Sequence, residues 1–213
     1  MYPKGNLSLP ASHGQLEAIL KGPAGDIKGA GLVCHPHPMG GGTMHNKVVF
    51  RTAAGLIDAG LTTLRFNFRG VGASTGEHDE GRGEQQDVLD ALDYLSSNYP
   101  GEEITQAGFS FGTWVGSQVA VNDGRVVRLV SIGTPVDKYA SFDHMENLRM
   151  PVLFVHGDRD EFGSVDSLKK LVDRVSKVTQ TRLVIFENCG HFFDNHLDDL
   201  RKTIKEWVIE QTS

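Results

Sequence analysis

The first residue that could do chemistry is a serine between two glycines, in the segment Gly108-Phe109-Ser110-Phe111-Gly112. A strand-like run precedes this segment, and a stretch of helical period follows it. Gly-x-Ser-x-Gly at such a turn exposes a serine hydroxyl at the end of a sheet, because glycine permits a sharp turn and close backbone approach. The positive end of the helix dipole also faces any negative charge that develops there. Ser110 is the candidate nucleophile; the alternative is a Gly-rich turn that only begins a helix.

A serine hydroxyl is a weak nucleophile at neutral pH, and it needs a base that a carboxylate orients. The strand expected at 151–156 runs into a loop that carries Asp158 and Asp160. The strand expected at 182–186 runs into a loop that ends in His191. Loops at the carboxyl ends of parallel strands meet at one edge of a sheet, so an acid and a base are expected there. The alternatives are an ordinary helix cap for Asp160 and a surface or packed loop residue for His191.

Strands and helices alternate along the chain, which predicts right-handed βαβ units. The fold class is therefore α/β, with a mostly parallel central sheet, helices on both faces and residues 1–213 in one domain. Strands are expected within 7–21 and at 28–35, 61–66, 104–108, 126–132, 151–156 and 182–186. Helices are expected at 45–59, 82–97, 111–122, 165–178 and 194–210.

Composition narrows the classes of partner. The 213 residues carry a net charge of −6 without a cluster of Lys or Arg, which argues against nucleic acid and membrane surfaces as partners. No apolar run approaches the length of a membrane span, and the first residues lack the apolar core of a signal peptide. Cys34 and Cys189 are expected to be free thiols. We expect a cytoplasmic monomer or homodimer that acts on a small molecule.

Several segments together resemble the α/β-hydrolase superfamily over nearly the whole chain. They are Gly-Phe-Ser-Phe-Gly at 108–112, His-Gly-Asp-Arg-Asp at 156–160, Gly-His-Phe-Phe at 190–193 and Arg-Gly-Val-Gly-Ala-Ser at 69–74. The stretch 34–47, with its His-Pro-His-Pro sequence, is similar to a subgroup of small bacterial hydrolases related to dienelactone hydrolases and serine peptidases. Dienelactone hydrolases use a cysteine nucleophile, so their lactone activity does not carry over to a serine.

The resemblance implies a Ser-Asp-His triad in that chain order, with Ser110 as nucleophile and His191 as base. The superfamily's Gly-x-x-Asp pattern places the acid at Asp160. The implied enzyme is a carboxylesterase-like serine hydrolase without a cofactor. It would cleave a small ester, thioester or amide through an acyl-enzyme.

The resemblance also implies an oxyanion hole made by two backbone N–H groups. One belongs to Phe111, which follows the nucleophile, and the other to the loop after the third strand. Pro36 and Pro38 have no N–H, which leaves His37 and Met39 early in that loop. His35-Pro36 aligns with the His-Gly of related enzymes, so His37 is the expected donor.

Two other functions use the same residues differently. His35, His37 and His45 could hold a metal ion in a metal-assisted hydrolase, but no His-Glu-x-x-His or comparable spacing accompanies them, and no metal is expected. A non-catalytic binding protein with the same fold would not need Ser110, Asp160 and His191 together. Labelling by a fluorophosphonate separates the enzyme from the binding protein.

Cap domains of the superfamily usually follow the sixth strand, and here only residues 133–150 are available. That length allows one short helix and no cap domain, so an open site for small substrates is expected. Met39, Tyr139 and Phe142 are the candidate substrate-binding residues. The polar loop 67–81 is the one segment that could replace a lid.

Overall fold

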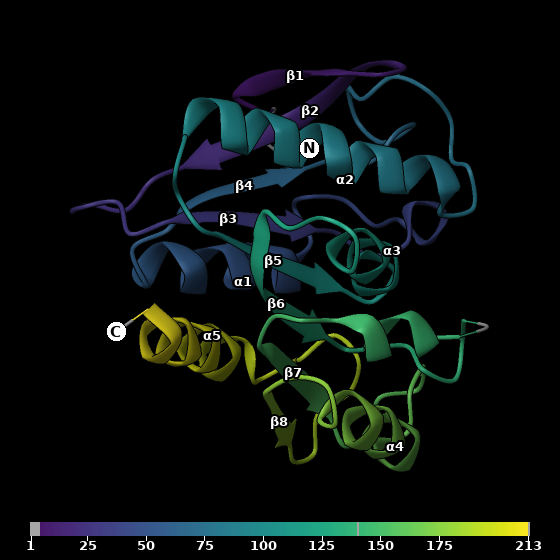
Figure 1. The fold of residues 1–213 in the computed structure, drawn as a ribbon. Helices are drawn as coiled ribbons and strands as arrows, with labels where there is room; N and C mark the ends of the chain where they lie inside the picture. Colours follow the sequence, from purple (N-terminus) through teal and green to yellow (C-terminus); the bar gives the residue numbers. More distant parts are fainter. Residues whose placement is uncertain (1–4, 140, 213) are drawn as a thin grey trace.

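One sheet of eight strands runs through the computed structural model, which describes residues 5–139 and 141–212 (Figure 1). The strand order is β1-β2-β4-β3-β5-β6-β7-β8. β2 is antiparallel to both of its neighbours, and every pair from β4 through β3 to β8 is parallel. The strands are β1 (Leu7–Ala11), β2 (Gly14–Lys21), β3 (Ala30–Cys34), β4 (Thr62–Phe66), β5 (Ile104–Phe109), β6 (Val126–Ile132), β7 (Val152–Gly157) and β8 (Thr181–Phe186). The expected mostly parallel sheet is confirmed.

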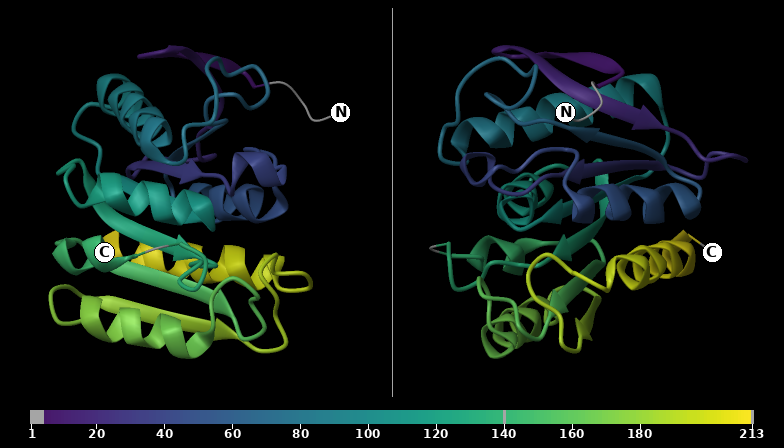
Figure 2. Two further views of the ribbon diagram at one scale, coloured as in Figure 1. Left: turned by 90° about the vertical axis from the view of Figure 1, so that its right-hand side faces the viewer. Right: turned by 180° about the vertical axis from the view of Figure 1, so that it is seen from behind.

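Helices cover both faces of the sheet, as expected (Figure 2). They are α1 (Lys47–Asp58), α2 (Arg82–Asn98), α3 (Phe111–Ala120), α4 (Val165–Val175) and α5 (Leu197–Thr212). α1 and α5 pack on one face, and α2, α3 and α4 on the other. Two neighbouring residues of β3 face opposite sides of the sheet: Leu32 packs in the cluster with α2, α3 and α4, and Val33 packs in the cluster with α1 and α5. Strands buried on both sides require near-continuous apolar sequence, and every residue of β3 is buried.

The last helix begins three residues later than its apolar pattern predicts. The expected segment starts at 194, whereas α5 starts at Leu197. Phe193 and Asn195 both have positive φ, at 55° and 69°. That conformation cannot continue a right-handed helix, so the chain turns twice before α5 begins.

The polar loop 67–81 is tied to the edge of the sheet. Thr75 N–H donates to Gln15 O at 2.9 Å, and Ala73 N–H donates to the Glu17 carboxylate at 2.9 Å. Gln15 and Glu17 belong to β2, which lies three strands away from β5 in the sheet order. Residues 73–75 therefore lie along β2 and do not cover the end of β5.

The segment 133–150 contains a single short 3-10 helix, Asp143–Asn147, in the part of it that the structure describes. This is what its length allows, and no cap domain is present there. None of the helices within residues 5–139 and 141–212 is long and apolar enough to cross a membrane.

Candidate active site

Ser110 occupies the sharp turn between β5 and α3. Its φ of 55° and ψ of −118° are strained for a residue with a side chain, and such a conformation costs on the order of 1–3 kcal/mol. Its N–H donates to Ile132 O at 3.0 Å, which fastens the turn to β6. Glycine is required on either side: a Cβ on Gly108 would lie 2.5 Å from the Gly112 backbone, and one on Gly112 would lie 2.4 Å from Cys34 O.

His191 and Asp160 form a buried pair beside this turn. His191 Nδ1 lies 2.8 Å from Asp160 Oδ2, and the residues are 2% and 8% exposed. The other carboxylate oxygen of Asp160 accepts the Phe162 N–H at 2.9 Å. Because both oxygens have fixed partners, the carboxylate is held still and the imidazole presents Nε2 away from it. Gly133 follows Ile132 at the end of β6, and a Cβ on Gly133 would lie 3.2 Å from His191 Cε1. The imidazole therefore lies next to the strand end that holds Ser110.

Ser110 Oγ and His191 are not hydrogen-bonded to each other among the residues that the structure describes. Contacts of this kind are often long in a free enzyme and tighten when substrate binds. The sequence-predicted nucleophile and the Asp160–His191 pair thus lie together, at the carboxyl ends of neighbouring parallel strands.

The two candidate acids have different partners. Asp158 Oδ1 accepts the Cys189 N–H at 3.0 Å, and backbone hydrogen bonds from Cys189 and Asn188 lower the pKa of Asp158. Asp158 thus shapes the loop before the histidine, whereas Asp160 contacts the imidazole itself.

Among the described residues, the backbone N–H groups of His37 and Phe111, both near Ser110, have no acceptor. The Met39 N–H, the other donor that the prolines leave in this loop, donates to His37 Nδ1 at 3.2 Å. Gly112 lets α3 approach the end of β3 closely, so the two free groups come from adjoining backbone segments. Two such donors beside a serine suit the oxygen of a tetrahedral intermediate.

The comparisons with known proteins show the family to which the chain belongs. Residues 31–207 match the family described as alpha/beta hydrolase domain. An uncharacterized protein of Rickettsia prowazekii, RP471, is 35% identical over 210 residues, covering 91% of this chain and 88% of its own.

Two solved structures share both fold and sequence with it. An alpha-beta serine hydrolase homologue from Coxiella burnetii is 36% identical with a TM-score of 0.88, and the match covers 100% of both chains. XC6422 from Xanthomonas campestris, described as a serine hydrolase without lid, is 31% identical with a TM-score of 0.87, covering 99% of this chain and 97% of its own. The chain belongs to the α/β-hydrolase family. It is an α/β-hydrolase enzyme without a lid domain, as the sequence resemblance implied.

The histidines of the His-Pro-His-Pro loop have structural partners in this α/β hydrolase. His35 is fully buried, its Nδ1 lies 2.6 Å from Pro36 O, and its Nε2 accepts the Phe68 N–H at 3.0 Å. Burial lowers the pKa of His35 to about 3, so the ring is neutral. Because both ring nitrogens are in use, His35 has no lone pair for the metal site considered with His37 and His45.

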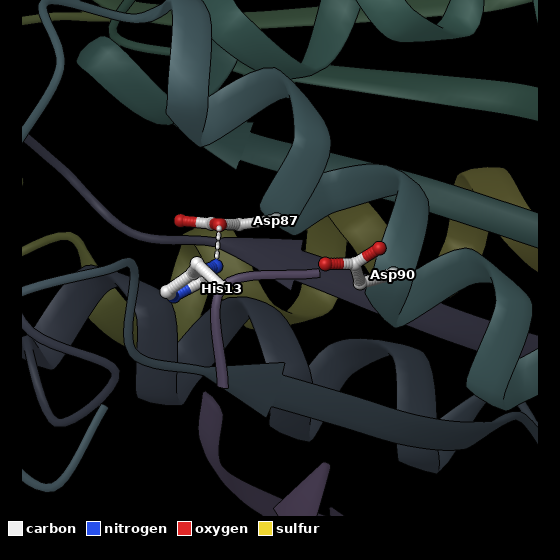
Figure 3. Close-up of side chains that lie close together, drawn as sticks. All are labelled: His13, Asp87 and Asp90. Carbon is white, nitrogen blue, oxygen red and sulfur yellow. Dashed lines mark ion pairs between the residues drawn. The ribbon is translucent and has the colours of Figure 1, made fainter. Parts of the chain in front are cut away.

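A different group of possible metal ligands lies near the turn between β1 and β2 (Figure 3). His13, Asp87 and Asp90 each offer one ligand atom there, all within 4.8 Å of one another. The Arg69 guanidinium already binds the Asp87 carboxylate, with Nη2 at 2.7 Å from Oδ1. Asp90 accepts the Ser12 N–H at 2.9 Å. The Arg69 cation thus already balances the negative charge of Asp87, which a metal ion would otherwise balance.

The three expected wall residues have different surroundings. Met39 is 76% exposed and, with Arg69 and His78, lines a hollow of about 470 Å³ beside the His-Pro-His-Pro loop. Tyr139 stacks on Trp114 with ring centroids 4.8 Å apart. Phe142 is 4% exposed and packs in the core, and its contact with substrate stays a prediction. Its ring stacks on His144 and not on any member of the triad.

Sequence reasoning missed one residue of the site, His156 in β7. Its side chain is fully buried, and Nε2 donates to Gly163 O at 2.6 Å. Nδ1 then faces Asp160 Oδ2 at 3.7 Å without a hydrogen bond. Burial lowers the pKa of His156, which favours the neutral ring. The histidine of His-Gly-Asp-Arg-Asp was the available signal, but in sequence it is simply part of a buried strand.

Neither cysteine is placed to act as a nucleophile. Both are buried free thiols, and burial raises the pKa of Cys189 to about 11 and that of Cys34 still further. Thiols that stay protonated at neutral pH are poor nucleophiles.

Proposed function

We propose that this α/β hydrolase is an esterase that cleaves small esters through an acyl-enzyme on Ser110. The main support for this proposal is the buried hydrogen bond of 2.8 Å between Asp160 and His191, next to a serine in a strained turn. Burial of a polar pair costs free energy. In an enzyme the pair activates the serine, whereas a binding protein has little use for it. Thioesters and amides are the related bonds that the same groups could cleave.

The reaction follows from the atoms in place. Asp160 holds Nδ1–H of His191, so Nε2 has the free lone pair and accepts the proton of the Ser110 hydroxyl. Oγ attacks the ester carbonyl carbon, and the carbonyl oxygen becomes an oxyanion that receives hydrogen bonds from the His37 and Phe111 N–H groups.

Collapse of this tetrahedral intermediate breaks the bond to the alcohol oxygen, which takes the proton from His191 and leaves. Water then repeats the sequence: His191 removes its proton, the hydroxide oxygen attacks the acyl carbon, and Ser110 recovers its proton as the acid departs. No step uses a metal or an organic cofactor.

The test is hydrolysis of p-nitrophenyl butyrate by the wild-type protein and two variants. Ser110→Ala and His191→Ala should each lower kcat about 10⁴-fold or more and leave KM little changed, since both remove interactions made in the transition state. Wild-type protein that is folded and inactive on esters, thioesters and amides would instead favour the binding protein.

A further inference from the structure

A lysine stands beside the proposed catalytic base. Lys138 follows β6, and its Nζ lies 4.1 Å from the centroid of the Phe162 ring. The Phe162 ring in turn packs edge-on against His191, with centroids 4.6 Å apart. A cation over an aromatic face is attracted to it, so the ammonium group is held one ring away from the imidazole.

The charge of Lys138 is not neutralised by a carboxylate. The side chain is exposed, and among the described residues it forms no salt bridge. The adjacent Asp137 is already used, because its carboxylate accepts the Ser164 N–H at 2.6 Å. Lys47, the other lysine near the site, is paired with Asp194. Lys138 is therefore a cation with its hydrogen-bond donors available to a ligand.

His37, whose ring packs against Phe111 next to Ser110, offers a second donor. Its Nδ1 accepts the Met39 N–H, so in the neutral ring Nε2 carries the hydrogen. Among the described residues this N–H has no acceptor. Burial, the neighbouring His78 and the Lys138 charge all lower the pKa of His37. The Lys138 charge is thus close enough to act on His37, while its ammonium group lies over the Phe162 ring.

We propose that Lys138, with His37 Nε2–H, binds an anionic group of the substrate, so that the preferred ester carries a carboxylate a few bonds from the scissile carbonyl. This inference rests on the proposed esterase function. An open site encloses little of a substrate, and a single unpaired charge then contributes a large part of its selectivity. Near a protein surface two charges in contact can change binding by about 10-fold or more, and salt screens much of that.

The test compares esters that differ only in charge. On the alcohol side, 4-acetoxybenzoate is compared with 4-acetoxybenzamide; on the acyl side, mono-p-nitrophenyl adipate is compared with p-nitrophenyl adipamate. Lys138→Met should lower kcat/KM for the charged ester of at least one pair about 10-fold and change the neutral esters less than about 2-fold. Lys138→Glu should reverse the preference, and about 0.5 M NaCl should weaken it in the wild type.

The matched control is Lys177→Met, which removes an exposed lysine beyond α4 and should alter neither pair. Equal effects of Lys138→Met on charged and neutral esters in both pairs would overturn the inference while the esterase function stands. Absence of Ser110-dependent hydrolysis for all four esters would overturn the esterase function, and this inference with it.

Discussion

At the scale of single residues, the account depends on which atom of which carboxylate meets His191. Asp160 Oδ2 contacts His191 Nδ1. Asp158, two residues before Asp160, accepts the N–H of Cys189, two residues before His191. Both residues are aspartates in one loop, so they form a matched pair for mutation. An acid that orients the base must accept a hydrogen from it, whereas a cap only needs to order the backbone.

Asp160→Asn should lower kcat about 10⁴-fold, because an amide can donate to Nδ1 and stabilise the imidazole tautomer that has no lone pair for the serine proton. Asp158→Asn should leave kcat within about 3-fold of wild type, since an amide oxygen still accepts the Cys189 N–H. Steady-state hydrolysis of p-nitrophenyl butyrate measures both. A severe Asp158→Asn and a mild Asp160→Asn would show that the acid is assigned to the wrong residue.

His35 makes folding stability depend on pH. Its pKa is about 3 in the folded protein because of burial, against 6.5 for an ordinary imidazole. Between those values the unfolded chain binds one more proton, so stability present above pH 6.5 is lost as the pH falls, by about 1.4 kcal/mol per pH unit. Urea unfolding at pH 7 and pH 5 measures this loss.

The control is His35→Gln, which keeps an acceptor for the Phe68 N–H and cannot be protonated. The difference in unfolding free energy between wild type and variant should change by about 2 kcal/mol between pH 7 and pH 5, in favour of the variant at pH 5. Parallel losses in the two proteins would contradict a buried neutral His35.

At the scale of elements, the site depends on how closely α3 approaches β3. A Cβ on Gly112 would lie 2.4 Å from Cys34 O and 2.6 Å from His35 O, and backbone atoms cannot move aside as a flexible side chain can. We expect this contact to bring the His37 and Phe111 N–H groups together, since His37 follows His35 and Phe111 precedes Gly112. Fold and chemistry are thus linked at a single glycine.

Gly112→Ala should destabilise the protein by about 1–3 kcal/mol and reduce kcat, because forced separation of α3 from β3 spreads the two N–H groups. Gly124→Ala is the control, since a Cβ there meets nothing within 4 Å, and it should be within about 0.5 kcal/mol of wild type. Thermal unfolding and ester hydrolysis together test this. Wild-type values for Gly112→Ala would refute the close approach.

The order of elements could be read from the sequence because apolar runs and helical periods alternate clearly. The same reading brought Ser110, Asp160 and His191 to one sheet edge, since parallel strands end there together. Local backbone conformation could not be read: Asn tolerates positive φ, but nothing in the sequence marks Phe193 for it, and both residues adopt it before α5. Residues of the same type also differ in how deeply they are buried, and the sequence alone does not show this. Phe142 could pack in a wall or in the core, and only the surrounding helices decide for the core.

At the scale of the whole molecule, the segments 67–81 and 133–150, which could cover the site, form no lid domain among their described residues. Residues 73–75 are bonded to β2, and the segment after β6 contains one short 3-10 helix among its described residues. The hollow beside Met39 has polar and apolar lining residues, among them Arg69, His78 and Val71. Because no lid domain covers the site, we expect only a short apolar part of a substrate to be enclosed.

An open site predicts a short acyl preference. Each methylene buried contributes about 0.8 kcal/mol, close to a fourfold gain, so kcat/KM should rise from acetyl to about butyryl esters and then level or fall as further carbons remain in water. A series of p-nitrophenyl esters from acetyl to dodecanoyl, kept below micelle formation, measures this. A steady climb through the octanoyl to dodecanoyl esters would point to an acyl tunnel.

The most direct test of the account is where a fluorophosphonate attaches. Attack by a serine oxygen on phosphorus expels fluoride and leaves a stable phosphonyl ester, so the modified residue is found by peptide mass. We predict one label per chain, on Ser110, absent in Ser110→Ala and strongly slowed in His191→Ala. A label on another residue, or undiminished labelling of Ser110→Ala, would contradict Ser110 as the nucleophile.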